Sequence, residues 1–347
     1  MQIKVFKVIA LLCCLVFVFL IPLFVTQLYW LHTFTMFAIH AMLALGLWLI
    51  VITGQVSFGQ AAYMGIGGYA SALFCKELGL GLFTTILAGG VVAGLLGLSF
   101  GYLTLRVRGA YFFVLSFAFA EIVKVLMRSI RKDILGGPNG ILDIPHPTIT
   151  IGALNLSFVS ETGPNTSLYY WLAMACLVIT ILLVWFITRS RFGRELRGIA
   201  QSDDLAESLG INVFRHLLVT FAIGCFIAGV AGAIQSYNFT MVTSDWMEVG
   251  HSIDQLSWVI VGGMGSIGGP IIGAFILTII GELLRAVGAY EPIFSGATLV
   301  MIMLFLPGGL ISLRVPKFST LLGIFKRLSR AISFTSGGSS GNRKQSS

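Results

Sequence analysis

Charge is scarce in this sequence. Asp, Glu, Lys and Arg make up only 10% of its 347 residues, whereas 56% are hydrophobic. A soluble domain carries about 25% charged residues, because its surface must face water. A chain with so little charge cannot cover a globular surface of this size, so we expect lipid to be its solvent. The composition therefore predicts an all-α integral membrane protein.

Several motifs that carry chemistry are also missing. The sequence has no G-x-x-x-x-G-K-[ST] and hence no phosphate-cradling loop of its own. It has no H-E-x-x-H, its five cysteines lie in apolar stretches without metal-ligand spacing, and its five histidines are scattered. We therefore expect no cofactor on this chain and no enzymatic activity. The net charge of +8 comes mainly from short loops and the C-terminal tail, which is typical of membrane orientation and not of a nucleic-acid partner.

Hydrophobic runs long enough to cross a bilayer predict about ten transmembrane helices. The first run follows Lys4 and Lys7 and lacks a clear cleavage site, so it is interpreted as a helix and not as a signal peptide. The runs cover residues 8–28, 34–52, 56–75, 82–104, 110–127, 168–187, 214–236, 252–264, 270–287 and 294–312. Polar stretches at 128–167 and 189–213 separate them.

The distribution of basic residues predicts cytoplasmic N- and C-termini. With this orientation most Lys and Arg residues lie on the cytoplasmic side, the cluster from Lys124 to Lys132 being the exception. Residues 1–313 then form the transmembrane domain, with a cytoplasmic loop at 189–213. Residues 314–335 are interpreted as a basic amphipathic helix on the cytoplasmic leaflet, or alternatively as a solvated basic tail. Residues 336–347 are too polar to bury a core and are expected to be disordered.

Two glycine-rich segments interrupt the apolar pattern, at 54–69 and 262–273. Interrupted membrane helices are typical of permeation sites in transporters, because irregular backbone at membrane depth must face protein or a watery cavity. The alternative is tight helix packing without substrate contact. The candidate residues for a translocation path are Gln55, Ser57, Gln60, Gly262, Gly263 and Gly265.

The cytoplasmic loop contains the pattern of a short helix near 205–209. Asp204 and Glu207 have the spacing of an N-cap and its reciprocal partner, and Gly210 suits the left-handed position after a helix. Such a helix either contacts a partner or only connects its neighbours.

Charged residues within apolar runs are costly and usually face an interior or a cavity. Glu121 with Lys124 and Glu282 with Arg285 are each three residues apart, so each pair can meet on one helix face. Asp254 has no adjacent basic partner. We interpret these residues as satisfied interior pairs or interfacial charges.

Taken in order, these segments resemble the LivM-type permease subunit of branched-chain amino-acid ABC importers. The resemblance covers about residues 34 to 313. Its motifs are 54–69, 105–112, 121–123, 136–140, 206–212, 252–254, 262–270 and 307–310.

The resemblance implies a multi-pass protein of the bacterial plasma membrane that forms a pore with a LivH-type permease subunit. It also implies two cytosolic ATPase subunits, which would bind the ATP, and an extracytoplasmic solute-binding protein. In such importers a short cytoplasmic helix docks into the ATPase, and the matching residues are Asp204, Ala206, Glu207, Leu209 and Gly210.

Other functions remain open at this point. The same kind of importer could carry urea, short amides or other amino acids. A stand-alone channel or secondary carrier is the alternative from a different class. A membrane enzyme would need a catalytic constellation, and the sequence shows none.

Overall fold

The computed structural model describes residues 28–284, apart from 108, 131, 146–147, 152–153, 158, 161–162 and 165, together with 296–297, 300 and 309–310. The spans predicted at 8–28 and 294–312 fall almost entirely outside these residues, as do the interfacial helix at 314–335 and the tail at 336–347. Ten spans and cytoplasmic termini therefore stay predictions.

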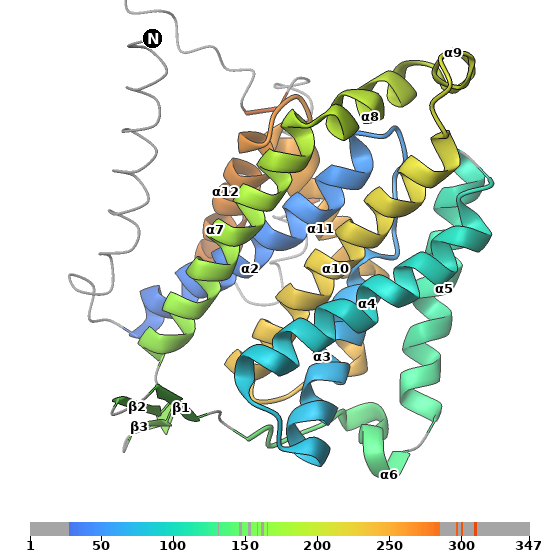
Figure 1. The fold of residues 1–347 in the computed structure, drawn as a ribbon. Coiled ribbons are helices and arrows are strands. Elements are labelled where there is room, and N and C mark those ends of the chain that lie inside the picture. Colours follow the sequence, from blue (N-terminus) through green and yellow to red (C-terminus); the bar gives the residue numbers. More distant parts are fainter. Residues whose placement is uncertain are drawn as a thin grey trace, which may run out of the picture.

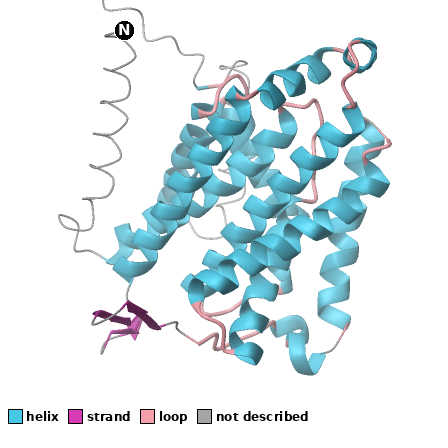
Figure 2. Ribbon diagram, viewed as in Figure 1, coloured by secondary structure: helices cyan, strands magenta, loops and turns pink. Residues whose placement is uncertain are grey.

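The described chain is predominantly helical (Figure 2). Its long and short α-helices are α2 (Leu28–Val51), α3 (Gln60–Leu78), α4 (Leu82–Thr104), α5 (Ala110–Ser129), α6 (Lys132–Leu135), α7 (Thr166–Arg189), α8 (Arg191–Gln201), α9 (Asp203–Ser208), α10 (Val213–Phe239), α11 (Val249–Gly262) and α12 (Gly268–Leu284). Two 3-10 helices, η1 (Gly137–Asn139) and η2 (Ser244–Met247), lie between them.

The polar stretch predicted at 128–167 contains two small antiparallel ribbons that the all-α prediction did not include. In the first, β1 (Thr148–Ile151) pairs with β2 (Leu154–Ser157), with Thr148 opposite Ser157. In the second, β3 (Val159–Ser160) pairs with β4 (Gly163–Pro164). The ribbons lie at the opposite end of the molecule from α8 and α9 (Figure 1).

Four of the described helices, α2, α4, α7 and α10, are long and apolar enough to cross a bilayer. Helix α11 has only 14 residues and α12 has 17. At 1.5 Å per residue, α11 is about 21 Å long, which is less than the hydrocarbon thickness of about 30 Å. The two therefore form a hairpin of shorter elements within the bundle.

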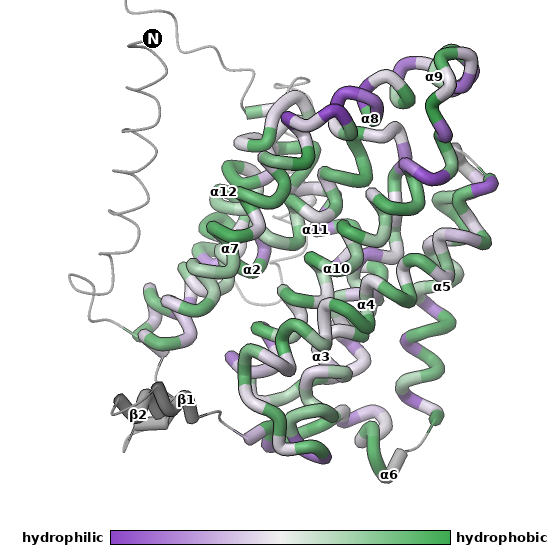
Figure 3. Tube along the Cα trace, viewed as in Figure 1, coloured by the Kyte–Doolittle hydropathy of each residue, from purple (hydrophilic) through white to green (hydrophobic). Residues whose placement is uncertain are grey.

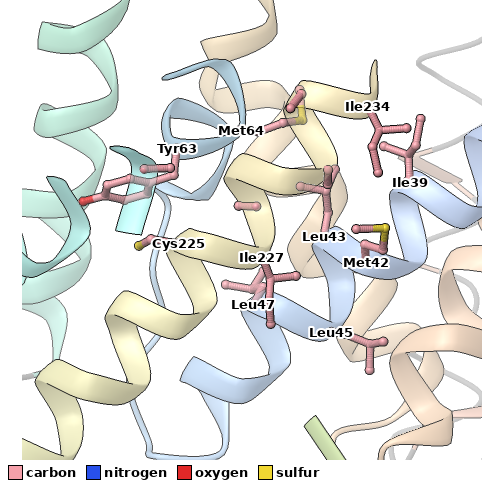
Figure 4. Packing of buried hydrophobic residues seen from close by; sticks show 14 of the residues in the cluster. Ile39, Met42, Leu43, Leu45, Leu47, Tyr63, Met64, Cys225, Ile227 and Ile234 are labelled. Atoms are coloured by element: carbon pink, nitrogen blue, oxygen red, sulfur yellow. The ribbon is translucent and has the colours of Figure 1, made fainter. Parts of the chain in front are cut away.

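Helix α10 lies at the centre of the bundle, where it packs against α2, α3 and α4. The buried contacts include Tyr63 and Met64 from α3, Leu43 from α2, and Cys225 and Ile227 from α10 (Figure 4). Helices α2 and α10 are apolar on all faces, as expected for helices surrounded by other helices.

Glycines allow the central helices to approach closely. A Cβ atom on Gly67 of α3 would overlap the backbone of Gly229 on α10, and one on Gly232 would overlap the carbonyl oxygen of Met64. The packing of α3 on α10 is therefore backbone against backbone, as is common between membrane helices.

The long helices consist mostly of hydrophobic residues (Figure 3). Leu103 on α4, Tyr111 on α5 and Ile179 on α7 are among many large apolar side chains that the chain leaves exposed. A soluble monomer rarely exposes contiguous apolar surface of this extent. These faces therefore suit contact with lipid or with another membrane subunit.

Candidate functional site

The loop that joins α7 to α10 folds into two helices at one end of the molecule, α8 and α9 (Figure 1). The chain bends sharply after α7, where the Ser190 hydroxyl accepts a hydrogen bond from the amide of Gly193 at 3.3 Å. Gly193 lies so close to the backbone of Ile187 and Thr188 that a side chain would overlap them. The bend therefore depends on a glycine at this position.

Helix α8 is amphipathic. Leu196 and Ile199 are buried, whereas Arg191, Arg194 and Arg197 are exposed. One face therefore packs on the bundle, against α7 and α10, and the basic face points outward.

Helix α9 confirms the predicted short helix, but its N-cap is Ser202 and not Asp204. The Ser202 hydroxyl accepts a hydrogen bond from the amide of Leu205 at 3.3 Å. Ser202 has the extended backbone of a cap, whereas Asp204 lies inside the first turn. A carboxylate at this position instead stabilises the helix by interacting with the positive end of its dipole.

The end of α9 follows the prediction. Gly210 has φ +81°, and its amide donates to the carbonyl oxygen of Glu207 at 2.9 Å. The next amide, of Ile211, donates to the carbonyl oxygen of Ala206 at 3.1 Å. This arrangement closes the helix through a left-handed glycine.

Replacing the cap should loosen α9 alone. Ser202→Ala is expected to cost about 1 kcal/mol of local helix stability, equivalent to a roughly fivefold increase in amide exchange at Leu205 and Glu207. Asp204→Ala should change exchange much less. Hydrogen-exchange mass spectrometry of the purified protein measures both, and the reverse ranking would restore Asp204 as the cap.

The five residues predicted to contact a partner divide between two faces of this region. Ala206 is buried against the bundle, whereas Asp204, Glu207, Leu209 and Gly210 are exposed. Leu205 was not among these five residues, and its side chain is 61% exposed beside Leu209 at 74%. Two large leucines on an otherwise polar helix are typical of a contact surface, because water alone would not favour them.

The first glycine-rich segment is a break between two helices. Residues 52–59 are not helical and descend from the end of α2 to the start of α3 (Figure 1). Gly54 has φ +84°, and a Cβ atom on it would lie 3.9 Å from Cα of Ala200, at the end of α8. The break therefore begins beside the α8–α9 loop and ends inside the bundle.

Two serines hold the lower end of this break. The amide of Phe58 donates to the Ser116 hydroxyl on α5 at 3.0 Å, and the amide of Ala61 donates to the Ser252 hydroxyl on α11 at 3.1 Å. These serines satisfy backbone donors that the missing helical turn leaves open. Nothing in their sequence spacing marks them, because each lies far from the break along the chain.

The three polar residues predicted to line a path here are buried: Gln55 and Ser57 in the break and Gln60 at the start of α3. The Gln60 amide nitrogen donates to the carbonyl oxygen of Gly224 on α10 at 2.9 Å. The side-chain oxygens of Gln55 and Gln60 have no hydrogen-bond partner within the described chain. Most buried oxygens in proteins accept a hydrogen bond, so each of these two oxygens could accept one from water or a ligand.

The second glycine-rich segment is the turn between α11 and α12. A side chain on Gly262 would overlap the carbonyl oxygen of Gly269, and Gly309 lies directly on Gly263. Gly262 and Gly263 therefore allow close packing of the backbone. Gly265 differs, because an added Cβ there would meet open space.

The two glycine-rich segments meet opposite ends of α11. The start of α3 contacts Ser252 near the beginning of α11. Gly262 lies ten residues further along α11, which is about 15 Å at the rise of an α-helix. Trp48 on α2 ties the α11–α12 turn in place by donating to the Met264 carbonyl oxygen at 2.9 Å. Gln60 and Gly262 therefore do not share one compact pocket.

The predicted pair of Glu121 and Lys124 is confirmed, with Lys124 Nζ 3.3 Å from Glu121 Oε1. Lys124 also lies 3.5 Å from a carboxylate oxygen of Glu248, and Arg128 donates to the Ser244 hydroxyl and pairs with Asp245. These contacts connect α5 to the η2 segment. They pair two residues of the basic cluster, Lys124 and Arg128, with carboxylates.

Asp254 has a partner that the sequence reasoning overlooked. His251 Nδ1 lies 3.8 Å from Asp254 Oδ2, one helical turn earlier on α11. The prediction had considered only Lys and Arg as partners and was wrong on this point. The other predicted pair cannot be compared, because Arg285, the expected partner of Glu282, lies outside the described residues.

A cavity of about 760 Å³ opens between α2, α11 and α12. It gathers Asp254 and Glu282 together with histidines that look scattered in the sequence: His32, His40 and His251. Apolar side chains of Met36, Trp258 and Leu277 complete its walls. His40 and Met36 repeat the helical spacing of His32, which is the sequence signal that could have placed them on one face.

His40 is fixed within this cavity. Its Nδ1 lies 2.9 Å from the Thr278 hydroxyl of α12, and its ring stacks on Trp258 of α11 at 4.3 Å between centroids. Three helices therefore meet at one imidazole.

Membership of a family follows from comparison with known proteins. Residues 29–306 match the family described as the branched-chain amino acid transport system permease component, so the chain belongs to this family of membrane permeases. No solved structure matches the chain.

The similar proteins include both kinds of permease subunit. The chain is 29% identical to the high-affinity branched-chain amino acid transport system permease protein LivM of Salmonella typhimurium, over 83% of this chain and 71% of that protein. It is 28% identical to LivM of Escherichia coli, over 84% and 72%. It is also 26% identical to the LivH permease protein of S. typhimurium, over 80% and 92%.

Proposed function

We propose that this chain is the transmembrane permease subunit of an ATP-driven importer for branched-chain amino acids in the bacterial plasma membrane. Its partners are a LivH-type permease subunit, two cytosolic ATPase subunits and an extracytoplasmic solute-binding protein. The observation that carries the proposal is α9, a capped short helix that presents Leu205 and Leu209 at the end of the bundle. The names of the similar permeases support the cargo.

The same proposal places the termini in the cytoplasm and gives the complete chain about ten spans. ATP binds to the partner subunits, so this chain needs no cofactor. Its own task is mechanical: α9 receives the movement of the ATPase and the bundle alternates its access, which requires no covalent chemistry.

A physical route for that movement leads from the loop into the bundle. Helix α9 follows α8 directly, and the end of α8 at Ala200 meets Gly54 at the start of the 52–59 break. The break in turn contacts α5 and α11 through Ser116 and Ser252. A shift of α8 therefore reaches two helices through a non-helical segment that can bend.

The translocation path is proposed to run beside Gln55, Ser57 and Gln60, and the unsatisfied side-chain oxygens of Gln55 and Gln60 would favour a polar cargo. The cavity between α2, α11 and α12 is a second candidate for a part of the translocation path. It combines carboxylates with apolar side chains, which suits a zwitterion with an apolar side chain. Gly262 and Gly263 contribute through packing, whereas Gly265 remains open to contact.

Reconstitution tests the proposal. Liposomes that contain this chain, a LivH-type subunit, the ATPase pair and the binding protein should accumulate radiolabelled leucine when ATP is supplied. Liposomes with this chain alone should show no uptake. Gradient-driven uptake by the single chain would replace the proposal with a stand-alone channel or secondary carrier.

The cargo is tested on the binding protein. Isothermal titration with leucine, urea, acetamide and other amino acids should show that a branched-chain amino acid binds most tightly. Preference for urea or an amide would keep the importer and change its cargo.

A further inference from the structure

The ring of His216 joins α8 to the first turn of α10. Its Nδ1 lies 2.7 Å from the carbonyl oxygen of Asn212, the N-cap residue of α10. Its Nε2 lies 2.8 Å from a carboxylate oxygen of Glu195 on α8. Phe192, one turn earlier on α8, stacks on the ring with 5.0 Å between centroids. The contact between the two helices is therefore centred on one imidazole.

Both ring nitrogens face hydrogen-bond acceptors. A carbonyl oxygen and an ionised carboxylate can only accept, so each nitrogen must carry a proton for its bond to form. Neutral histidine has a single N–H, whereas the imidazolium has two. The two bonds of His216 therefore coexist, beside an ionised Glu195, only when the ring is charged. Charge-assisted hydrogen bonds are about twice as strong as neutral ones.

We propose that His216 is a proton-dependent latch that positions the coupling helix α9. Its imidazolium form holds α8 on α10, and the neutral form releases one of the two bonds. The inference rests on the proposed docking role of α9. Only Ser202 separates α8 from α9, so the seating of α8 decides where Leu205 and Leu209 are presented.

The charges around the ring have opposite effects on an imidazolium, since a carboxylate stabilises it and neighbouring arginines oppose it. Glu195 from α8 supplies the negative group that meets the ring, and the polarised Asn212 carbonyl faces its other side. Arg215 precedes the ring on α10, and Arg191 and Arg194 flank the contact residues on α8.

The end of α4 adds one further cation to this region. Its Arg106 lies over Tyr102, which contacts Phe214 of α10. Histidine is the side chain that ordinarily changes charge between roughly pH 5 and 8. Deprotonation of the ring would remove one of its two hydrogen bonds, because a neutral imidazole has a single N–H.

The test is the pH profile of substrate-stimulated ATPase in the assembled complex, divided by the basal rate in the same buffers. In the unmodified complex, stimulation should fall at least about tenfold from acidic to alkaline buffers, as expected for loss of one hydrogen bond to a charged group. His216→Ala should show low stimulation at every pH. Arg197→Gln, which removes an exposed charge from the same helix, should keep the unmodified profile.

Glu195→Gln separates the latch from a merely structural contact. The amide of glutamine can donate to the unprotonated Nε2 of a neutral ring, so the contact survives without charge. Stimulation should therefore persist in this variant and its pH dependence should flatten. A profile like that of the unmodified complex, or full stimulation in His216→Ala, would overturn the latch.

Amide exchange in α8 gives a second measure that does not depend on turnover. After correction for intrinsic rates, exchange should accelerate at high pH in the unmodified complex but not in Glu195→Gln. Loss of stimulation when Leu205 and Leu209 are made polar, together with unaffected His216 variants, would remove the latch and keep the docking role. Full stimulation of ATPase by substrate in the Leu205 and Leu209 variants as well as in the His216 variants would contradict the docking role of α9.

Discussion

Gly232→Val is expected to prevent the bundle from assembling. A side chain at this position on α10 would overlap the Met64 carbonyl oxygen of α3, which is backbone and cannot turn aside. Overpacking a core usually costs about 1–3 kcal/mol, and a clash between two backbones lies at or above the upper end. We expect almost no monodisperse protein after detergent extraction, and a clear loss of thermal stability in any that remains.

The matched control is Gly281→Ala on α12, where an added Cβ would meet no heavy atom within 4 Å. That variant should extract and unfold like the unmodified protein. Normal yield and unfolding temperature for Gly232→Val would show that α3 and α10 do not meet as closely as the structure describes.

The double variant Leu205→Asp with Leu209→Asp is expected to uncouple the complex while leaving this chain folded. Both side chains are largely exposed, so their replacement removes no internal packing. Apolar anchors at the centre of an interface commonly carry 2 kcal/mol or more, so stimulation of ATPase by substrate should fall at least about tenfold. Uptake in liposomes should fall in parallel.

A single added carboxylate elsewhere in the loop controls for charge. Gln201→Glu lies on the exposed surface of α8 and should leave coupling intact. Gly210→Val should reduce coupling in the same direction as the double variant, since φ +81° is unfavourable for a β-branched residue. Full stimulation in the double variant would mean that another surface meets the ATPase.

Hydropathy is suited to predicting long apolar helices. Helix α4 was expected at 82–104 and lies at Leu82–Thr104, because a long apolar run ends at both sides in glycine or charge. The start of α3 was expected at 56 and lies at Gln60. The glycine-rich segment at 54–69 was recognised as an interruption, but only the contacts of Phe58 and Ala61 with α5 and α11 show where the break ends.

The coupling loop shows a similar limit. The sequence predicted a short helix and its closing glycine, but the spacing of Asp204 and Glu207 led to the wrong N-cap, since Ser202 is an equally suitable residue type. The backbone angles decide for Ser202. The link between Glu195 and His216 was not visible at all, since no periodic pattern encodes a contact between separate helices.

The grouping of the histidines in the cavity could not be predicted from the sequence either. His40 and His251 lie on different helices and come together only because α2 packs against α11 and α12. The sequence shows which side chains lie on each helix face. Which helices pack against one another depends on how well their surfaces fit, and the sequence does not show this directly.

The fastening of α5 to η2 has a mechanical consequence. The chain between α10 and α11 is held at that end by Arg128 and Lys124, and also by paired backbone hydrogen bonds between Ile141 and Val242. Helix α10 has 27 residues, about 40 Å, with this anchor at one end and the coupling loop at the other. If α9 receives the movement of an ATPase, that movement acts on α10 at the end opposite this anchor, so the anchored end would resist a displacement of α10 along its axis.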